Sequence, residues 1–223
     1  MILLIETSGK TCSIALADKE KCISFREQTS ANFKHAELVN LYIEEVLDEA
    51  KITPDKLSAI AVSGGPGSYT GLRIGTSSAK GLCYALDIPL IVVDTLLGMT
   101  SYFLELNPAV NAGAILYPMI DARRLEVFTQ KLSTNLEQLG EVYPLILDEN
   151  TFYSEESEII FFGDGADKLI DKIDFVNNNI SIVSDFNPSA KGLIKLSYAK
   201  FLAKDFSDLA YFEPNYLKEF KVG

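Results

Sequence analysis

The chain has 223 residues, 31 of them acidic and 20 basic, and a formal net charge of −11. This length suits one or two domains with a sizeable core. Because proteins that bind nucleic acid phosphates normally carry a basic stripe, and the longest basic run here is Arg123–Arg124, the composition argues against a nucleic-acid-binding surface. Neither an apolar run of about 18 residues nor a leader pattern occurs, so we expect no membrane span, no signal peptide and a cytoplasmic protein.

Hydrophobic periodicity predicts an α/β order in the first half of the chain. Residues 1–8, 11–18 and 21–27 predict a meander of three strands. We then expect a helix at 33–50, a strand at 57–63, a helix at 70–86, a strand at 90–93 and a helix at about 95–106. Three strands followed by alternating helices and strands are the ribonuclease-H-like order.

The helix expected at 33–50 has a wider apolar face than one core contact needs. A single contact needs a stripe somewhat over ~100° wide, and the apolar residues here cover about half of the circumference. Seating the helix on its sheet requires only Val39, Ile43, Val46, Leu47 and Ala50. The remainder predicts a partner surface of Leu38, Leu41 and Tyr42, with His35, Glu45 and Glu49 nearby. The alternative is a helix buried on two sides within its own domain.

Residues 64–76 (GGPGSYTGLRIGT) connect the strand at 57–63 to the next helix. Gly64, Gly65 and Gly67 can adopt positive φ, so the chain can turn sharply here. A phosphate cradle is one interpretation, because a helix N-terminus favours anions. However, no lysine follows Gly71 as a P-loop requires, and the glycine spacing does not fit the dinucleotide fingerprint. A tight strand-to-helix turn with close packing is the interpretation we favour.

Gly71, Gly75 and Ala79 recur every four residues along the helix at 70–86 and form a ridge with almost no side chain. An internal glycine costs up to ~1 kcal/mol relative to alanine, so we expect another backbone to lie against this ridge. The spacing does not say whether that backbone belongs to the same chain. We predict that the ridge and the apolar face of helix 33–50 form one interface with a partner.

The second half predicts a smaller set of elements. Strands are expected near 113–120, 124–131 and 141–147, another at 158–162 leads into Gly163-Asp164-Gly165, and a helix follows near 188–204. We therefore expect an N-terminal lobe at 1–107 and a C-terminal lobe at 108–223.

Few side chains suggest catalysis. No group of His, Cys, Asp and Glu has metal-ligand spacing. Asp94 and Asp121 stand at strand ends, where a carboxylate can bind magnesium or act as a base, but a helix cap or turn is the commoner role. The three cysteines form no C-x-x-C pair and fit apolar patterns, so we expect buried free thiols.

Several segments resemble the TsaB (YeaZ) family of bacterial proteins. The most specific is GGPGSYTGLRIGTSSAKGL at 64–82. The others, in chain order, are ILLIETSGKTCSIAL at the N-terminus, KHAELVNLYIEEVL, IPLIVVDTL, MIDARRLEVF at 119–128, FFGDGADKL at 161–169 and EPNYLK near the end. The resemblance runs nearly end to end and is weakest at about 132–158 and 171–195.

The resemblance implies the α/β fold of the actin-like ATPase (ASKHA) superfamily, with two ribonuclease-H-like lobes of which the second is reduced. In that superfamily a nucleotide lies between the lobes, and residues 5–10 correspond by position to the first phosphate turn. The candidate nucleotide-binding residues are Thr7, Ser8, Lys10, Gly65 and Gly67. Glu6 departs from the aspartate usual in the ATPases and the second lobe is short, so we expect no cofactor.

The resemblance also implies a role. TsaD proteins carry a paired-histidine metal motif after the strand that resembles IPLIVVD, whereas residues 94–102 contain no histidine. A non-catalytic, metal-free subunit is therefore implied, which binds and activates a TsaD-type catalytic subunit as threonylcarbamoyl is placed on adenosine 37 of tRNA. Further implications are a homodimer when alone, contact with a TsaE-type ATPase through the complex, and no direct tRNA binding.

Two alternatives stay open. The chain could be an autonomous ATPase, carbamoyltransferase or phosphotransferase of the same fold, in which case it would turn over ATP without a partner. It could also be a peptidase acting on partner proteins, as resemblance to proteins once described as glycoproteases suggests. The peptidase would have little chemistry to use, because the sequence has no HExxH helix, no Gly-x-Ser-x-Gly elbow and no convincing Cys/His pair.

Overall fold

The computed structural model describes residues 1–30, 34–147, 157–170 and 179–217. The chain divides into two compact units, Met1–Tyr102 with Pro188–Gly223, and Phe103–Asn187. This division differs from the expected lobes 1–107 and 108–223, because the C-terminal segment lies with the first unit. Within the described ranges, no helix is both long and apolar enough to cross a membrane.

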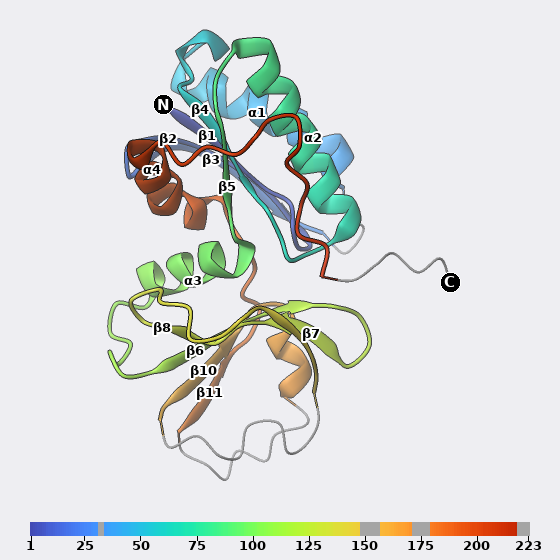
Figure 1. Ribbon diagram of the computed structural model, residues 1–223, viewed down its shortest axis with the longest axis vertical. Helices are drawn as coiled ribbons and strands as arrows, with labels where there is room; N and C mark the ends of the chain where they lie inside the picture. The colour runs from blue at the N-terminus through green and yellow to red at the C-terminus, as the bar shows by residue number, and fades with distance from the viewer. Residues whose placement is uncertain (31–33, 148–156, 171–178, 218–223) are drawn as a thin grey trace. The chain divides into compact units, whose positions relative to one another are not determined.

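The first unit is built on a five-stranded mixed sheet with the order β3-β2-β1-β4-β5 (Figure 1). Its strands are β1 (Ile2–Glu6), β2 (Thr11–Asp18), β3 (Lys21–Thr29), β4 (Ala59–Ser63) and β5 (Leu90–Val93). The β1–β2 and β2–β3 pairs are antiparallel, and the β1–β4 and β4–β5 pairs are parallel. This is the ribonuclease-H-like order that the sequence predicts.

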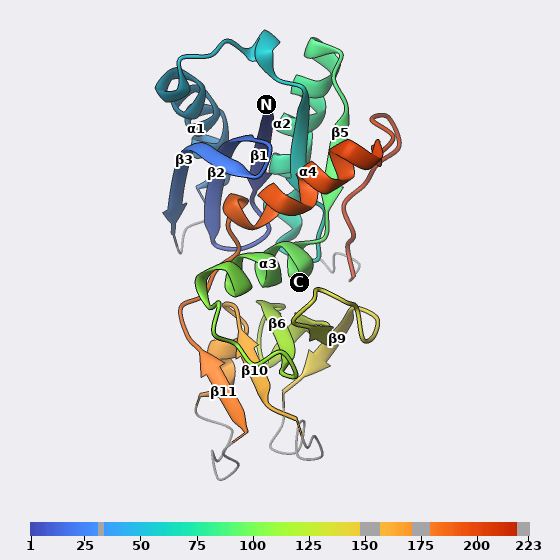
Figure 2. The same cartoon turned by 90° about the vertical axis from the view of Figure 1, so that its left-hand side faces the viewer.

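Both faces of this sheet are apolar, and different helices cover them. Leu3 and Ile5 of β1 pack in a core with α1 (His35–Ala50) and α2 (Tyr69–Leu86). Ile2 and Leu4 point to the opposite face, as the period of a strand requires. There they pack against η3 (Ala190–Leu193) and α4 (Ile194–Ala203), and α4 lies across this face in Figure 2. The need to cover this second face explains why the C-terminal segment belongs to the first unit.

Helix α3 (Thr95–Leu106) follows β5 at the expected position. The 3-10 helix η1 (Pro54–Lys56), which precedes β4, was not expected from the sequence. Helix α1 begins at His35, and residue 33 of the expected helix lies outside the described residues.

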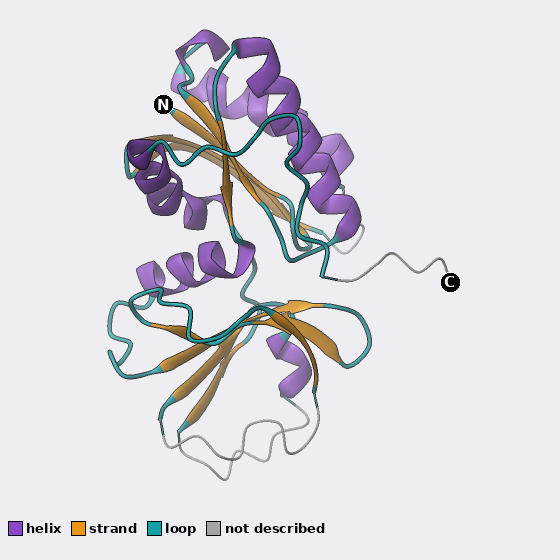
Figure 3. Ribbon diagram, in the orientation of Figure 1, coloured by secondary structure: helices purple, strands orange, loops and turns teal. Residues whose placement is uncertain are grey.

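The second unit contains a six-stranded mixed sheet with the order β11-β10-β6-β7-β9, to which β8 adds beside β6 (Figure 3). The bounds are β6 (Ile115–Asp121), β7 (Glu126–Thr129), β8 (Leu132–Ser133), β9 (Tyr143–Ile146), β10 (Ile159–Phe162) and β11 (Ile180–Val183), with the 3-10 helix η2 (Ala166–Leu169). Strands β8 and β11 were not expected from the sequence.

Aromatic side chains fill part of the core of the second unit. Phe103 stacks on Phe162 with ring centroids 4.2 Å apart, and Phe186 meets both rings edge-on. A second cluster joins Met119, Val127 and Phe161 to η2. The second unit therefore has its own hydrophobic core.

Candidate functional site

The glycine-rich turn at residues 64–68 packs against backbone of its own unit. Gly65 has φ +100°, and a Cβ there would lie 2.6 Å from the Asn215 carbonyl oxygen. A Cβ on Gly67 would lie 2.6 Å from the carbonyl oxygen of Ser8, which also accepts a hydrogen bond of 2.6 Å from the Ser68 amide. Ser68 then caps α2 by accepting from the Gly71 amide. The turn therefore has the close packing that we favoured over a phosphate cradle.

The candidate nucleotide residues lie near one another, but their donors are largely used within the chain. The Thr7 hydroxyl donates to the Gly71 carbonyl at 2.8 Å, and the Ser8 amide donates to Glu6 Oε1 at 2.6 Å. Ser8 Oγ is buried next to the Glu6 carboxyl, which it helps to stabilise in the charged form. Lys10 is half-buried. Nucleotide binding at Thr7, Ser8, Lys10, Gly65 and Gly67 stays a prediction.

Glu6 ends β1 as a fully buried carboxyl group. Burial raises its pKa, and hydrogen bonding by the Ser8 side chain, the Ser8 amide and the Ser63 hydroxyl opposes that shift. Glu6 thus ties the end of β1 to the end of β4, directly below the turn.

The small-residue ridge of α2 is an internal contact, which corrects the expectation that it lies at a partner interface. A Cβ on Gly71 would lie 2.1 Å from the carbonyl oxygen of Thr7, and one on Gly75 would lie 2.3 Å from Thr7 Oγ1. Ala79 is fully buried in the core of the first unit. The backbone that the ridge requires is therefore the chain leaving β1.

His35 was also expected at the interface or surface, and the structure buries it. Its exposed fraction is 1%, and its Nε2 lies 3.0 Å from the carbonyl oxygen of Gly9. Since a carbonyl can only accept, Nε2 carries the proton in this contact. His35 therefore connects the start of α1 to the turn between β1 and β2, and it is not available to a partner.

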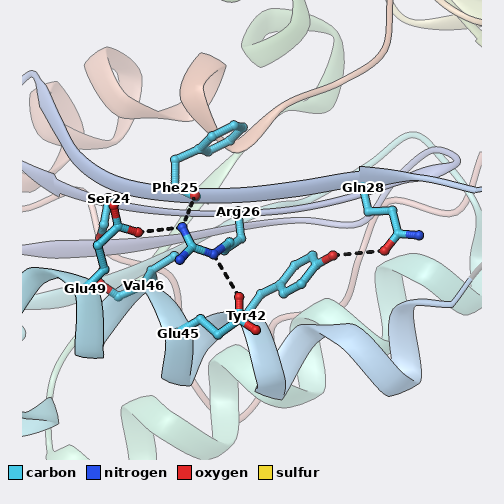
Figure 4. A network of polar contacts seen from close by, with 8 residues as sticks. All are labelled: Ser24, Phe25, Arg26, Gln28, Tyr42, Glu45, Val46 and Glu49. Carbon is cyan, nitrogen blue, oxygen red and sulfur yellow. Dashed lines mark hydrogen bonds and ion pairs between the residues drawn. The ribbon is translucent and has the colours of Figure 1, made fainter.

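The outer face of α1 is partly used by the edge strand β3 (Figure 4). Arg26 Nε donates to Glu45 Oε2 at 2.8 Å, and Arg26 Nη1 donates to Glu49. Tyr42 donates its hydroxyl proton to Gln28 Oε1 at 3.0 Å. Leu38 and Tyr42 also pack against the core of the first unit, so only part of the wide apolar face predicted for this helix is used within the unit, and Leu41 stays exposed.

The contacts between β3 and α1, which we call the β3 seam, were not predicted from the sequence. Ser24 donates to the carbonyl oxygen of Val46 at 2.6 Å. Ser24, Arg26 and Gln28 alternate along β3, so their side chains share the face that meets α1. This period-two polar pattern was the available signal.

Other parts of α1 and α2 stay exposed. Leu41 is 46% exposed on α1, and Leu38 is half-buried against the core. On α2, Tyr84 is 83% exposed and a Cβ on Gly81 would meet nothing within 4 Å. On α2, an open apolar groove of about 380 Å³ is lined by Lys80, Gly81 and Tyr84, with Leu209 and Ala210 of the C-terminal segment opposite. We call Leu41, Gly81 and Tyr84 the exposed helix surface.

The described part of the EPNYLK segment, residues 213–217, packs beside the glycine-rich turn through Asn215. The Asn215 amide donates to the Gly64 carbonyl at 2.7 Å. Lys80 of α2 donates to the carbonyls of Ala210 and Phe212, each at 3.1 Å. Asn215 therefore has a structural role at this turn, and Lys80 fixes the chain just before it.

The titratable groups considered for catalysis are engaged in internal contacts. Asp94 accepts from the Leu97 amide at 3.0 Å and so caps α3, and burial raises the pKa of its carboxyl. Asp121 forms an ion pair of 2.6 Å with Lys168. Burial raises the pKa of the Cys12 thiol to about 12 and that of Cys83 to about 11, so both are protonated at neutral pH. No three His, Cys, Asp or Glu side chains gather as a metal site among the residues described.

Comparisons with known proteins point to tRNA threonylcarbamoyladenosine biosynthesis, through both TsaB proteins and TsaD transferases. The model of the family described as TsaD, tRNA N6-adenosine threonylcarbamoyltransferase, matches residues 28–218. The tRNA threonylcarbamoyladenosine biosynthesis protein TsaB of Haemophilus influenzae is 28% identical over 97% of this chain and 93% of its own length. TsaB of Bacillus subtilis is 31% identical over 71% of this chain and 65% of its own. The solved structure of YeaZ from Pseudomonas aeruginosa superposes with a TM-score of 0.81 at 22% identity, covering 97% of this chain and 99% of that one.

Proposed function

The chain belongs to the TsaB/YeaZ family of tRNA threonylcarbamoyladenosine biosynthesis proteins, and from that membership we propose that it is a non-catalytic subunit. In this role it binds and activates a TsaD-type catalytic subunit during modification of adenosine 37 of tRNA. A TsaE-type ATPase joins through that complex. The site of action is the cytoplasm, because the substrate is tRNA.

The observation that carries the non-catalytic role is the internal use of the reactive side chains. His35, the only histidine in the sequence, contacts Gly9, Asp94 caps α3 and Asp121 pairs with Lys168. A general base or nucleophile must reach its substrate. These groups instead hold elements of their own unit together, as expected of a scaffold.

The exposed helix surface supports a binding role and gives the interface a revised set of residues. Helices α1 and α2 pack against each other, and Leu41, Gly81 and Tyr84 lie on their outer faces. A large exposed aromatic beside a glycine fits a central interface contact. We propose that this surface binds the TsaD-type subunit and, when the chain is alone, a second copy of itself.

Reconstitution of the reaction tests the proposed function. The isolated chain should transfer no threonylcarbamoyl from threonylcarbamoyl-adenylate to tRNA and should hydrolyse ATP only at background rate, with or without added zinc or iron. Adding TsaD and TsaE should give modified tRNA, and leaving out the chain should abolish it. Substantial turnover by the chain alone, retained after EDTA treatment and repurification, would contradict the proposal and favour an autonomous enzyme.

A further inference from the structure

Two sequence motifs of the second unit meet at the base of the β6–β7 hairpin. Lys168, from the FFGDGADKL segment, donates from Nζ to Asp121 Oδ1 at 2.6 Å and to the carbonyl oxygen of Glu126 at 2.8 Å. Asp121 ends β6 and Glu126 begins β7. The Lys168 ammonium group therefore connects the two strands directly below the hairpin tip.

Close backbone packing holds the second motif in this place. The Gly165 amide donates to the carbonyl of Met119 at 3.1 Å, and the Asp121 amide donates to Asp164 Oδ1 at 3.0 Å. A Cβ on Gly165 would lie only 2.8 Å from Val127 Cγ1 and 3.0 Å from the Ile120 carbonyl carbon. Glycine at this position lets the segment approach the hairpin closely enough for Lys168 to reach it.

The backbone at the hairpin tip has a conformation that is uncommon for residues other than glycine. Arg123 and Arg124 both have positive φ, +74° and +51°, in the left-handed region that glycine adopts more readily. The Arg123 amide donates to Asp121 Oδ1 at 2.6 Å, so the carboxylate held by Lys168 also fixes the tip. Two arginines are thus kept where glycine would be less strained, which points to a use for their side chains.

The side chains of the tip form a small exposed surface. Arg123 and Arg124 are exposed, and over the described residues neither guanidinium has an ion-pair partner. Leu125 is 47% exposed beside them, and Ile146 of the paired strand β9, opposite Glu126, is 68% exposed. The surface combines two positive charges with apolar area.

We propose that this hairpin tip is a docking element for a carboxylate-bearing protein surface. Guanidinium groups bind carboxylates through two parallel hydrogen bonds, and arginine with neighbouring apolar residues is typical of protein interfaces. RNA is less suited, because its recognition normally adds stacking aromatic side chains and a basic field. The tip residues 122–125 (ARRL) contain no aromatic residue, and the whole chain carries a net charge of −11.

This element is separate from the surface of the proposed function. The exposed helix surface lies on α1 and α2 of the first unit, whereas the tip belongs to the second unit. Loss of docking at the tip and loss of TsaD binding at the helices can therefore be measured independently with variants in different units.

Fluorescence anisotropy with two labelled probes tests the proposal. One probe is a peptide of about a dozen alternating Glu and Leu residues, and the other is an RNA stem–loop. The full chain should bind the peptide at physiological ionic strength, and Arg123→Glu with Arg124→Glu should weaken binding roughly tenfold or more, because like charges would then face each other. Arg123→Gln with Arg124→Gln should weaken it in the same direction and covers the case in which the charge reversal fails to fold.

The matched control is Lys19→Glu with Lys21→Glu at the β2–β3 hairpin of the first unit. It changes the formal net charge by the same four units, from −11 to −15, at exposed positions, and Lys19 also has positive φ. The control should change peptide binding less than about twofold, since long-range charge effects are screened. An equal loss in the control, binding of the RNA in preference to the peptide, or binding of neither probe would overturn the proposal.

Discussion

His35 shows how a single buried side chain holds two segments of the first unit together. Its ring connects the start of α1 to Gly9, which lies 26 positions earlier in the chain. Burial lowers the pKa of the imidazole, and the hydrogen bond with the Gly9 carbonyl opposes that shift. The folded state therefore favours neutral His35.

This preference predicts a specific pH dependence. Because the folded pKa lies below the usual 6.5, the unfolded chain binds the proton first as pH falls. The stability that neutral His35 contributes is full above about pH 6.5 and is lost below it, by at most ~1.4 kcal/mol per pH unit. His35→Gln keeps an N–H donor but does not titrate in this range.

Urea unfolding of both proteins between about pH 5 and pH 8 makes the measurement, and one titrating histidine limits the slope to the value above. The free energy of unfolding of the native chain should fall relative to that of His35→Gln as pH drops below 6.5. Parallel pH profiles for the two proteins would show that His35 does not titrate differently in the folded state.

The sequence singled out these residues correctly, but it did not predict which parts of the chain they contact. Gly71 and Gly75 were recognised as a close-packing ridge; Gly71 does meet a backbone, that of Thr7 in the same chain, whereas Gly75 meets the Thr7 side chain. His35 was assigned to the wrong environment, because the turn at Gly9 reaches it only through the pairing of β1 with β2. Helical periodicity reports which residues share a face, and it does not report what lies opposite.

At the scale of elements, helix α2 has small residues on two faces with different roles. Gly71, Gly75 and Ala79 face β1. Ser77 and Gly81 are exposed on another face, next to Tyr84. The inner face is fixed by packing, and the outer face is available to a partner.

Two alanine substitutions in this one helix should therefore have opposite effects on stability. Gly71→Ala places a methyl group against the Thr7 carbonyl and should lower the free energy of unfolding by about 1–3 kcal/mol. Gly81→Ala meets nothing within 4 Å and should raise it by up to ~1 kcal/mol, because alanine is the better helix former.

Chemical denaturation of the isolated proteins, at a concentration low enough to avoid self-association, gives both values. Similar stabilities for Gly71→Ala and the native chain would contradict the internal contact. Loss of stability in Gly81→Ala would show that the outer face of α2 is not open.

Strong periodic elements were predictable, and short ones were not. The helices α1, α2 and α3 begin and end within two residues of the expected bounds, because long amphipathic stretches have caps and apolar faces. Strands β8 (Leu132–Ser133) and β11 (Ile180–Val183) were missed, since each is short and contains a serine, whereas the equally short but wholly apolar β5 and β10 were predicted. The ion pairs of Arg26 in the β3 seam were not predicted, because they depend on how β3 lies against α1.

At the scale of the whole molecule, the C-terminal segment determines which surfaces stay open. It covers one face of the first sheet through α4 and continues past Lys80 to the glycine-rich turn. The opposite face carries α1 and α2, so the outer faces of these helices remain for a partner. Leu38 and Tyr42 contribute to the core or to the β3 seam, which makes Leu41 and Tyr84 the cleaner positions for a test.

Complex formation with a purified TsaD-type protein shows whether the exposed helix surface binds the catalytic subunit. Size exclusion with light scattering should show a complex for the native chain and none for Leu41→Asp or Tyr84→Asp, because an unpaired buried charge costs several kcal/mol, while circular dichroism confirms folding. Leu202→Asp, at a 65% exposed leucine on α4, should bind as the native chain does. Complexes of undiminished affinity with both Leu41→Asp and Tyr84→Asp would contradict the account.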